Sequence, residues 1–95
     1  MKTYIANSVF LYDVEDRYRG HNGNAQFTIV ARAKNQKRVA ELIGCCSLSH
    51  LRNFYGIHEA SGKHAGIPKK DDTIYYFVEN TKNGYVNDWF EYSPK

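Results

Sequence analysis

The clearest pattern of apolar and polar positions lies in the middle of the chain. An apolar stripe with the spacing of a helix consists of Val39, Leu42, Ile43 and Cys46. Lys37, Arg38 and Glu41 fall outside this stripe, so we expect their side chains to face solvent. The pattern predicts a helix near residues 35–45.

Residues that commonly begin and end helices flank this stripe. Asn35 stands just before it, where a side-chain oxygen can accept a backbone N–H and cap the helix. Gly44 stands near its end, and glycine readily adopts the left-handed conformation that a helix stop needs. Ser47 or Ser49 can cap a second helix, which we expect near residues 48–55.

The second predicted helix also has an apolar and a polar face. Its apolar face carries Leu48, Leu51 and Tyr55. Its outward positions are Ser49, His50 and Asn53, with Arg52 on the flank. The two helices are therefore expected to meet at a small core made of Leu42, Ile43, Leu48 and Leu51.

The helix pair resembles a helix-turn-helix. In that family a small residue of the first helix is followed four positions later by the glycine of the turn, and here these are Ala40 and Gly44. The family's next core positions fall on His50 and Asn53, which are polar, and the apolar residues come one position later. The resemblance covers about a quarter of the chain and implies binding of DNA by the second helix.

Alternating apolar and polar residues predict strands before and after the helix pair. We expect strands near residues 3–12, 25–32, 73–79 and 85–92. In the second of these, one face carries Phe27, Ile29 and Ala31, and the other carries Thr28, Val30 and Arg32. Asn83 and Gly84 are typical of the tight turn of a hairpin between the last two strands.

The elements follow one another in the order ββααββ, and loops are expected over residues 13–24 and 56–72. The simplest arrangement is an α+β fold in which a four-stranded antiparallel sheet carries the helix pair on one face. A length of 95 residues suits a single domain that spans residues 1–95. A composition of 42% hydrophobic and 24% charged residues is that of a globular protein.

The chain is rich in aromatic residues, with eight Tyr, five Phe and one Trp. A helix pair on one face of a single sheet cannot bury both faces of an aromatic hairpin. We therefore expect some of Tyr75, Phe77, Tyr85 and Trp89 on an open face. Aromatic side chains in such a position are suited to stack bases, bind a small nucleotide or form a protein interface, including that of a homodimer.

Charge is distributed unevenly along the chain. Residues 31–70 contain eight Lys or Arg and two acidic residues, whereas residues 71–95 contain two and five. A basic side of this kind favours phosphate groups, so we predict a nucleic-acid interface on the helix pair and the following loop. Its predicted residues are Arg32, Lys37, Arg38, Ser49, His50, Arg52, Asn53, Lys63, Lys69 and Lys70. Among them Ser49, His50 and Asn53 are the candidates for contact with base edges.

No residue pattern indicates catalysis or a bound cofactor. The residues considered for a metal site are His50, His58, His64 and Cys45, and their spacing matches no usual zinc site. We therefore expect no metal, no cofactor and no enzymatic activity. Adjacent Cys45 and Cys46 indicate the reduced thiols of a cytoplasmic protein. The apolar runs are short, so we expect neither a secretory signal nor a membrane span.

Three kinds of function fit these observations. The first is a small nucleic-acid-binding regulator that uses the basic helix pair and loop. The second is an inhibitor of a host or defence protein, because the size and polarised charge resemble those of small accessory proteins of phages and mobile elements. The third is a domain that binds a small molecule such as a nucleotide, or acts on it, in a pocket between the sheet and loop 56–72.

Overall fold

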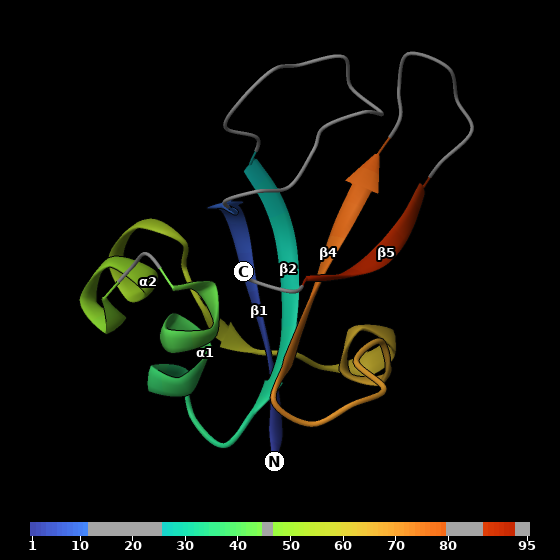
Figure 1. The fold of residues 1–95 in the computed structure, drawn as a ribbon, viewed down its shortest axis with the longest axis horizontal. Coiled ribbons are helices and arrows are strands. Elements are labelled where there is room, and N and C mark those ends of the chain that lie inside the picture. Colours follow the sequence, from blue (N-terminus) through green and yellow to red (C-terminus); the bar gives the residue numbers. More distant parts are fainter. Residues whose placement is uncertain (12–25, 45–46, 80–86, 93–95) are drawn as a thin grey trace.

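Two helices lie against one face of an antiparallel sheet (Figure 1). The computed structural model of the protein describes residues 1–11, 26–44, 47–79 and 87–92. Within these ranges five strands form a single sheet in the order β3-β1-β2-β4-β5. The strands are β1 (Lys2–Phe10), β2 (Gln26–Ala33), β3 (His58–Glu59), β4 (Thr73–Glu79) and β5 (Asn87–Tyr92). The helices are α1 (Gln36–Ile43), α2 (Leu48–Phe54) and the 3-10 helix η1 (Gly62–Gly66).

The sheet has one strand more than the four that the sequence predicts. The α+β class and the antiparallel pairing are confirmed, but the order ββααββ is interrupted by β3 and η1 before β4. Both elements lie within residues 56–72, where the sequence predicts a loop. Both residues of β3 are exposed, so no alternation of apolar and polar positions marks this strand.

Element ends lie within two residues of their predicted positions. β4 covers the predicted range 73–79, whereas α1 ends two residues before the predicted end at residue 45. The predictions for Cys45, Cys46, Tyr85, the loop 13–24 and the turn at Asn83 and Gly84 lie outside the described residues.

The predicted helix caps are confirmed. The side-chain oxygen of Asn35 accepts the backbone N–H of Arg38 at 2.9 Å, and Gly44 ends α1 in the left-handed region with a φ of 85°. Ser47, and not Ser49, caps α2, because its Oγ accepts the backbone N–H of His50 at 3.1 Å. Within the described ranges no helix is long and apolar enough to span a membrane.

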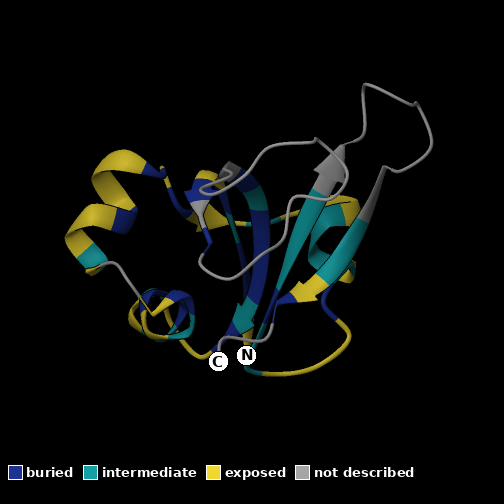
Figure 2. Cartoon of the chain, turned by 45° about the horizontal axis from the view of Figure 1, so that its top comes forward, coloured by how far each residue is buried: buried dark blue, intermediate teal, exposed yellow. Residues whose placement is uncertain are grey.

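The helix-covered face of the sheet holds the core, and Figure 2 shows the buried residues concentrated in the central strands. Strand residues in this core include Tyr4, Ala6, Val9, Phe27, Ile29, Ala31, Ala33 and Ile74, and helix residues include Val39, Ile43 and Leu51. The expected contact between the helices is confirmed for Ile43 and Leu51, which are 1% and 0% exposed. Leu42 and Leu48 are only half-buried, a departure from the expectation. Leu48 begins α2 at the rim of an open groove, which leaves part of its side chain uncovered.

The opposite face of the sheet is partly covered by η1, which lies across the sheet from α1 and α2 in Figure 1. Two hydrogen bonds hold the chain around η1 to β1. The backbone N–H of Ala60 donates to the carbonyl oxygen of Thr3 at 2.8 Å, and the Thr3 hydroxyl donates to the carbonyl oxygen of Ala65 at 3.4 Å. Val30 of β2 points to this face and is 0% exposed, so part of this face is fully buried.

Candidate nucleic-acid interface

An open groove of about 670 Å³, which we name the basic groove, runs between the helix pair and the β1–β3 edge of the sheet. Its polar lining consists of Lys2, Asn35, Gln36, Lys37, Arg52, His58 and Glu59. Three apolar residues, Tyr4, Leu48 and Ile57, complete the lining. Tyr4 and Ile57 are each 8% exposed, so the groove stands on the packed core of the domain.

Local structure explains how these side chains converge. Lys37 lies in the first turn of α1, two residues after the Asn35 cap. Arg52 of α2 donates from Nε to the side-chain oxygen of Gln36 at 2.9 Å, which ties the second helix to the start of the first. His58 pairs with Ile5 in the β3–β1 ladder, so the far wall is held by backbone hydrogen bonds.

The groove carries more positive than negative charge. Its lining contains the cations Lys2, Lys37 and Arg52, and Glu59 is the one carboxylate among the lining residues that the structure describes. Lys37 is exposed and has no ion pair within the described ranges. Clefts lined by charge of one sign focus the electrostatic field, so this groove suits an anionic group such as phosphate.

The predicted base-contacting residues lie on the outward face of α2. Ser49, His50 and Asn53 are all exposed. The side-chain amide of Asn53 donates to the Ser49 hydroxyl at 3.3 Å, and the His50 ring stacks on the Phe54 ring with a centroid distance of 4.6 Å. These side chains are accessible, but each already has a neighbour on its own helix.

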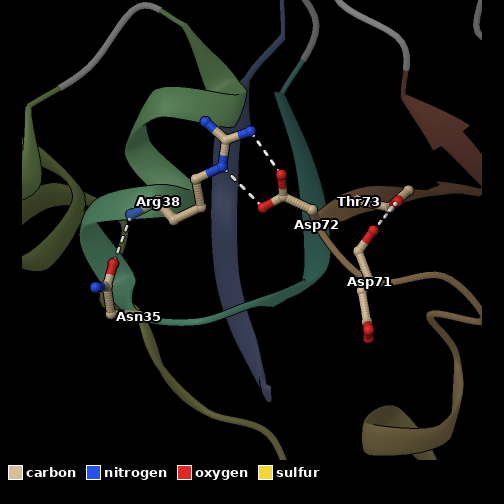
Figure 3. Close-up of polar contacts among 5 residues, drawn as sticks. All are labelled: Asn35, Arg38, Asp71, Asp72 and Thr73. Carbon is tan, nitrogen blue, oxygen red and sulfur yellow. Dashed lines mark hydrogen bonds and ion pairs between the residues drawn. The ribbon is translucent and has the colours of Figure 1, made fainter.

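Two of the predicted arginines are paired with acidic residues at the start of β4. Arg38 donates from Nε to Oδ1 of Asp72 at 2.8 Å and from Nη2 to Oδ2 at 2.6 Å (Figure 3). Arg32 donates from Nε to Oδ1 of Asp71 at 2.6 Å. The expectation that Arg38 faces solvent is therefore corrected, because its side chain is 34% exposed and turned toward a carboxylate.

The bidentate pair affects the charge state of both partners. The hydrogen bonds from Arg38 lower the pKa of the Asp72 carboxyl below its ordinary value, and the same bonds raise the pKa of the Arg38 guanidinium. Both groups are therefore ionised at neutral pH, and each largely cancels the field of the other. A phosphate gains less from Arg38 than from an unpaired cation such as Lys37.

The remaining predicted lysines lie away from the basic groove. Lys70 donates to Oε2 of Glu91 on β5 at 3.4 Å. Lys63 belongs to η1, and Lys69 follows η1 in an exposed position. Of the ten predicted residues, Lys37 and Arg52 line the groove together. The continuous basic side that the charge count indicates is divided between different parts of the surface.

Two residues of the groove are absent from the sequence-based prediction. Lys2 lies at the start of β1, and His58 lies in the segment for which a loop is predicted. Neither position carries a local signal, because the pairing of β3 with β1 brings them beside the helix pair. Only the sheet topology identifies them as neighbours of Lys37 and Arg52.

The histidines considered for a metal site are spread over three elements. His50 lies on α2, His58 on β3 and His64 on η1. In the part of the chain that the structure describes, no group of three or more His, Cys, Asp or Glu side chains is placed to hold a metal ion. Cys45 lies outside that part.

The fold and the basic groove were compared with known proteins. No protein-family model, no curated protein sequence and no solved structure matches this chain. The residues of the basic groove and their geometry are therefore the basis on which a function is assigned.

Proposed function

We propose that this protein binds nucleic acid and that the basic groove holds phosphate groups of the backbone. One observation carries the proposal: Lys2, Lys37 and Arg52 come from separate elements and line one groove, to which the described residues add a single carboxylate. Lysine and arginine side chains supply most of the electrostatic affinity for a nucleic-acid backbone. The groove is open, so an extended chain of phosphates can enter it from solvent.

The outward face of α2 supplies the base contacts in this proposal. Arg52 belongs to the groove, and Asn53 follows it directly on the exposed side of the same helix. A backbone phosphate on Arg52 would therefore bring neighbouring bases close to Ser49, His50 and Asn53. In this arrangement α2 acts as the second helix of a helix-turn-helix acts, with phosphates setting its position and side chains reading bases.

A salt series with two matched charge reversals tests the groove. Lys37→Glu places a negative charge in the groove, and Lys69→Glu makes the same change of net charge outside it. We expect Lys37→Glu to weaken binding to duplex DNA by about tenfold at low salt and to make the slope of log K against log salt shallower by about 0.9. Lys69→Glu should leave both quantities close to those of the wild type. Equal effects of the two substitutions, or no binding of DNA or RNA by the wild type at low salt, would contradict the proposal.

A further substitution separates base contact from phosphate contact. Asn53→Ala keeps every cation of the groove, so it should leave the salt dependence unchanged. We expect it to change the preference among binding sequences by about 1–3 kcal/mol at one base position. Comparing selected binding sequences for the wild type and for the variant measures this effect, and identical preferences would remove Asn53 from the interface.

A protein partner is the second candidate function, and one exposed aromatic side chain favours it. Phe54 at the end of α2 is 73% exposed, and His50 stacks against it. Exposed aromatic residues are common anchors of protein interfaces. If the protein inhibits a host or defence protein, Phe54→Ser should abolish a stoichiometric complex while Lys69→Glu leaves it intact. A partner that binds both variants equally would contradict this alternative.

A further inference from the structure

A second pocket lies on the face of the sheet opposite the helices. This pocket, which we name the aromatic pocket, has a volume of about 420 Å³ and is lined by Thr28, Lys63, His64, Ile67, Phe77 and Trp89. Residues of η1 and the position after it form one wall, and β2, β4 and β5 form the other. The volume lies within the range of small-molecule sites, about 300–1,000 Å³.

The strand register builds the aromatic wall. Phe77 of β4 stands directly opposite Trp89 of β5, and their ring centroids are 5.1 Å apart with an interplanar angle of 50°. The His64 ring approaches Trp89 edge-on, with a centroid distance of 6.2 Å and an angle of 75°. The hydrogen bond from the Thr3 hydroxyl to the carbonyl oxygen of Ala65 ties η1 to β1. The three rings therefore come from strands and a helix that are each anchored.

The lining combines flat apolar surface with positive charge. Phe77 and Trp89 are half-buried, so part of each side chain is exposed. Lys63 is exposed, and within the described part of the chain it has no ion pair and no carboxylate lines the pocket. A ligand that matches both properties has a planar aromatic ring and an anionic group. Aromatic side chains stack on nucleobases of any type, and lysine is a common partner of phosphate.

We infer that the aromatic pocket binds a free nucleoside monophosphate. The base stacks against Phe77 and Trp89, and the ammonium group of Lys63 contacts the phosphate. This inference goes beyond the proposed function, because it uses none of the residues of the basic groove and lies on the other face of the sheet.

Intrinsic fluorescence gives a direct measurement of this binding. Trp89 is the one tryptophan in the chain, so a change of tryptophan emission reports on the pocket itself. The titrants are AMP, GMP, CMP and UMP, with adenosine and inorganic phosphate as partial ligands, and excitation is set where nucleotides absorb little. We expect saturable quenching by at least one monophosphate and about tenfold weaker binding of adenosine than of AMP if AMP is bound. No saturable change with any monophosphate, or a change with single-stranded oligonucleotide alone, overturns the inference.

Two substitutions separate the parts of the ligand. Lys63→Ala should weaken the binding of the monophosphate by about tenfold and leave that of the matching nucleoside unchanged, because only the phosphate contacts Lys63. Phe77→Leu should weaken both ligands, because it removes an aromatic ring from the stack. Lys37→Glu in the basic groove serves as the control and should leave nucleotide binding unchanged. Equal weakening of nucleotide and nucleoside by Lys63→Ala overturns the assignment of the phosphate to Lys63. Lys37→Glu is expected to weaken DNA binding alone, and Lys63→Ala nucleotide binding alone. Each proposal can therefore fail in its own measurement while the other stands.

Discussion

On the helix-covered face of the sheet, Phe27, Ile29 and Ile74 are at most 2% exposed. On the face under η1, Val30 of β2 is fully buried, but the rings of Phe77 and Trp89 on the outer strands β4 and β5 are only half-buried. The covers of the two faces explain this difference. Helices α1 and α2 each present apolar residues at helical spacing, and Val39, Ile43 and Leu51 fill the space above the strands. The sequence of η1 is GKHAG, and none of its residues is buried, so it gives the sheet little apolar cover.

We therefore assign most of the stability of the fold to the helix-covered face, and the proposed nucleotide binding to the face under η1. A face packed without voids contributes most of the free energy of folding, since interior atoms gain transfer and dispersion energy together. The face with the thinner cover retains a pocket, which half-buried aromatic rings line. The helices contribute to the core and to the proposed nucleic-acid interface, because their inner faces pack on the sheet and other residues of both helices form one wall of the basic groove.

The largest expected effect on stability comes from the helix-covered face. Leu51 is 0% exposed, so Leu51→Ala should lower the free energy of unfolding by about 2–5 kcal/mol. Phe54 lies three residues later on the same helix and is 73% exposed, so Phe54→Ala should change it by less than about 0.5 kcal/mol. Urea denaturation of both variants measures the contrast. A loss below about 0.5 kcal/mol for Leu51→Ala would show that the helix pair is not part of the core.

The aromatic pocket should be less sensitive to truncation. Burial of Phe77 is partial, so Phe77→Ala should lower the free energy of unfolding by about 2 kcal/mol, less than the 3–5 kcal/mol typical of a fully buried phenylalanine. The same urea denaturation measures it. If Phe77→Ala destabilises the protein as much as Leu51→Ala, the two faces are equally packed and the contrast between them is wrong.

The corner between α1 and α2 depends on backbone conformation. Gly44 has a φ of 85°, and a Cβ there would meet nothing within 4 Å, so Gly44→Ala tests the conformation alone. We expect a loss of about 1–2 kcal/mol, the cost of the left-handed region for a residue with a side chain. Gly66 of η1 has equal space around a Cβ and no positive φ, so Gly66→Ala is the matched control and should be close to neutral. Equal effects on the unfolding midpoint in urea would contradict this reasoning.

The smallest expected effect on stability comes from the ion pair between Arg38 of α1 and Asp72, which lies just before β4. Because Arg38 lowers the pKa of Asp72 in the folded state, the pair stabilises the protein at pH values above the unfolded pKa of that carboxyl. This stabilisation is lost as the pH falls through the lower pKa of the folded state. The difference in melting temperature between the wild type and Asp72→Asn should therefore be present at neutral pH and disappear in acid. In an Arg38→Gln background, Asp72→Asn should remove no further pH-dependent stability, and a persistent difference there would assign the effect to another group.

Local signals explain which parts of the fold the sequence predicts. Asn35, Gly44 and Ser47 act on backbone groups within three or four residues, so helix ends are readable from sequence alone. Strand β4 is a continuous run of residues that favour strands, and its predicted range agrees with the structure. The alternation in β1 is interrupted at Ser8, where a φ of 55° and a register shift place Ala6 and Val9 on the same face.

Contacts between distant segments account for what the sequence does not predict. β3 contains two exposed residues, and its position depends on backbone bonds to β1 more than 50 residues earlier. The partner of Arg38 is 34 residues away, so only the return of the chain at the start of β4 turns this cation from a candidate phosphate ligand into an ion-pair partner. Composition and helical spacing contain no information about such pairs.

Each candidate site also combines residues that local patterns predict with residues that only the fold brings together. The sequence predicts that some of Tyr75, Phe77, Tyr85 and Trp89 lie on an open face, and the structure places Phe77 and Trp89 together in the aromatic pocket. Their neighbours Lys63 and His64 come from η1, which has no periodic signal. Lys37 and Arg52 are predicted from the helix pair, whereas Lys2 reaches the groove through the sheet.

Binding of two ligands by one set of variants tests the separation of the two faces most directly. The wild type, Lys37→Glu and Lys63→Ala are each titrated with duplex DNA and with the nucleoside monophosphate that binds the wild type most tightly. We expect Lys37→Glu to weaken DNA binding about tenfold and leave nucleotide binding unchanged, and Lys63→Ala to do the reverse. If both substitutions weaken both ligands to the same extent, a single anionic site serves them, and the assignment of separate functions to the two faces of the sheet is wrong.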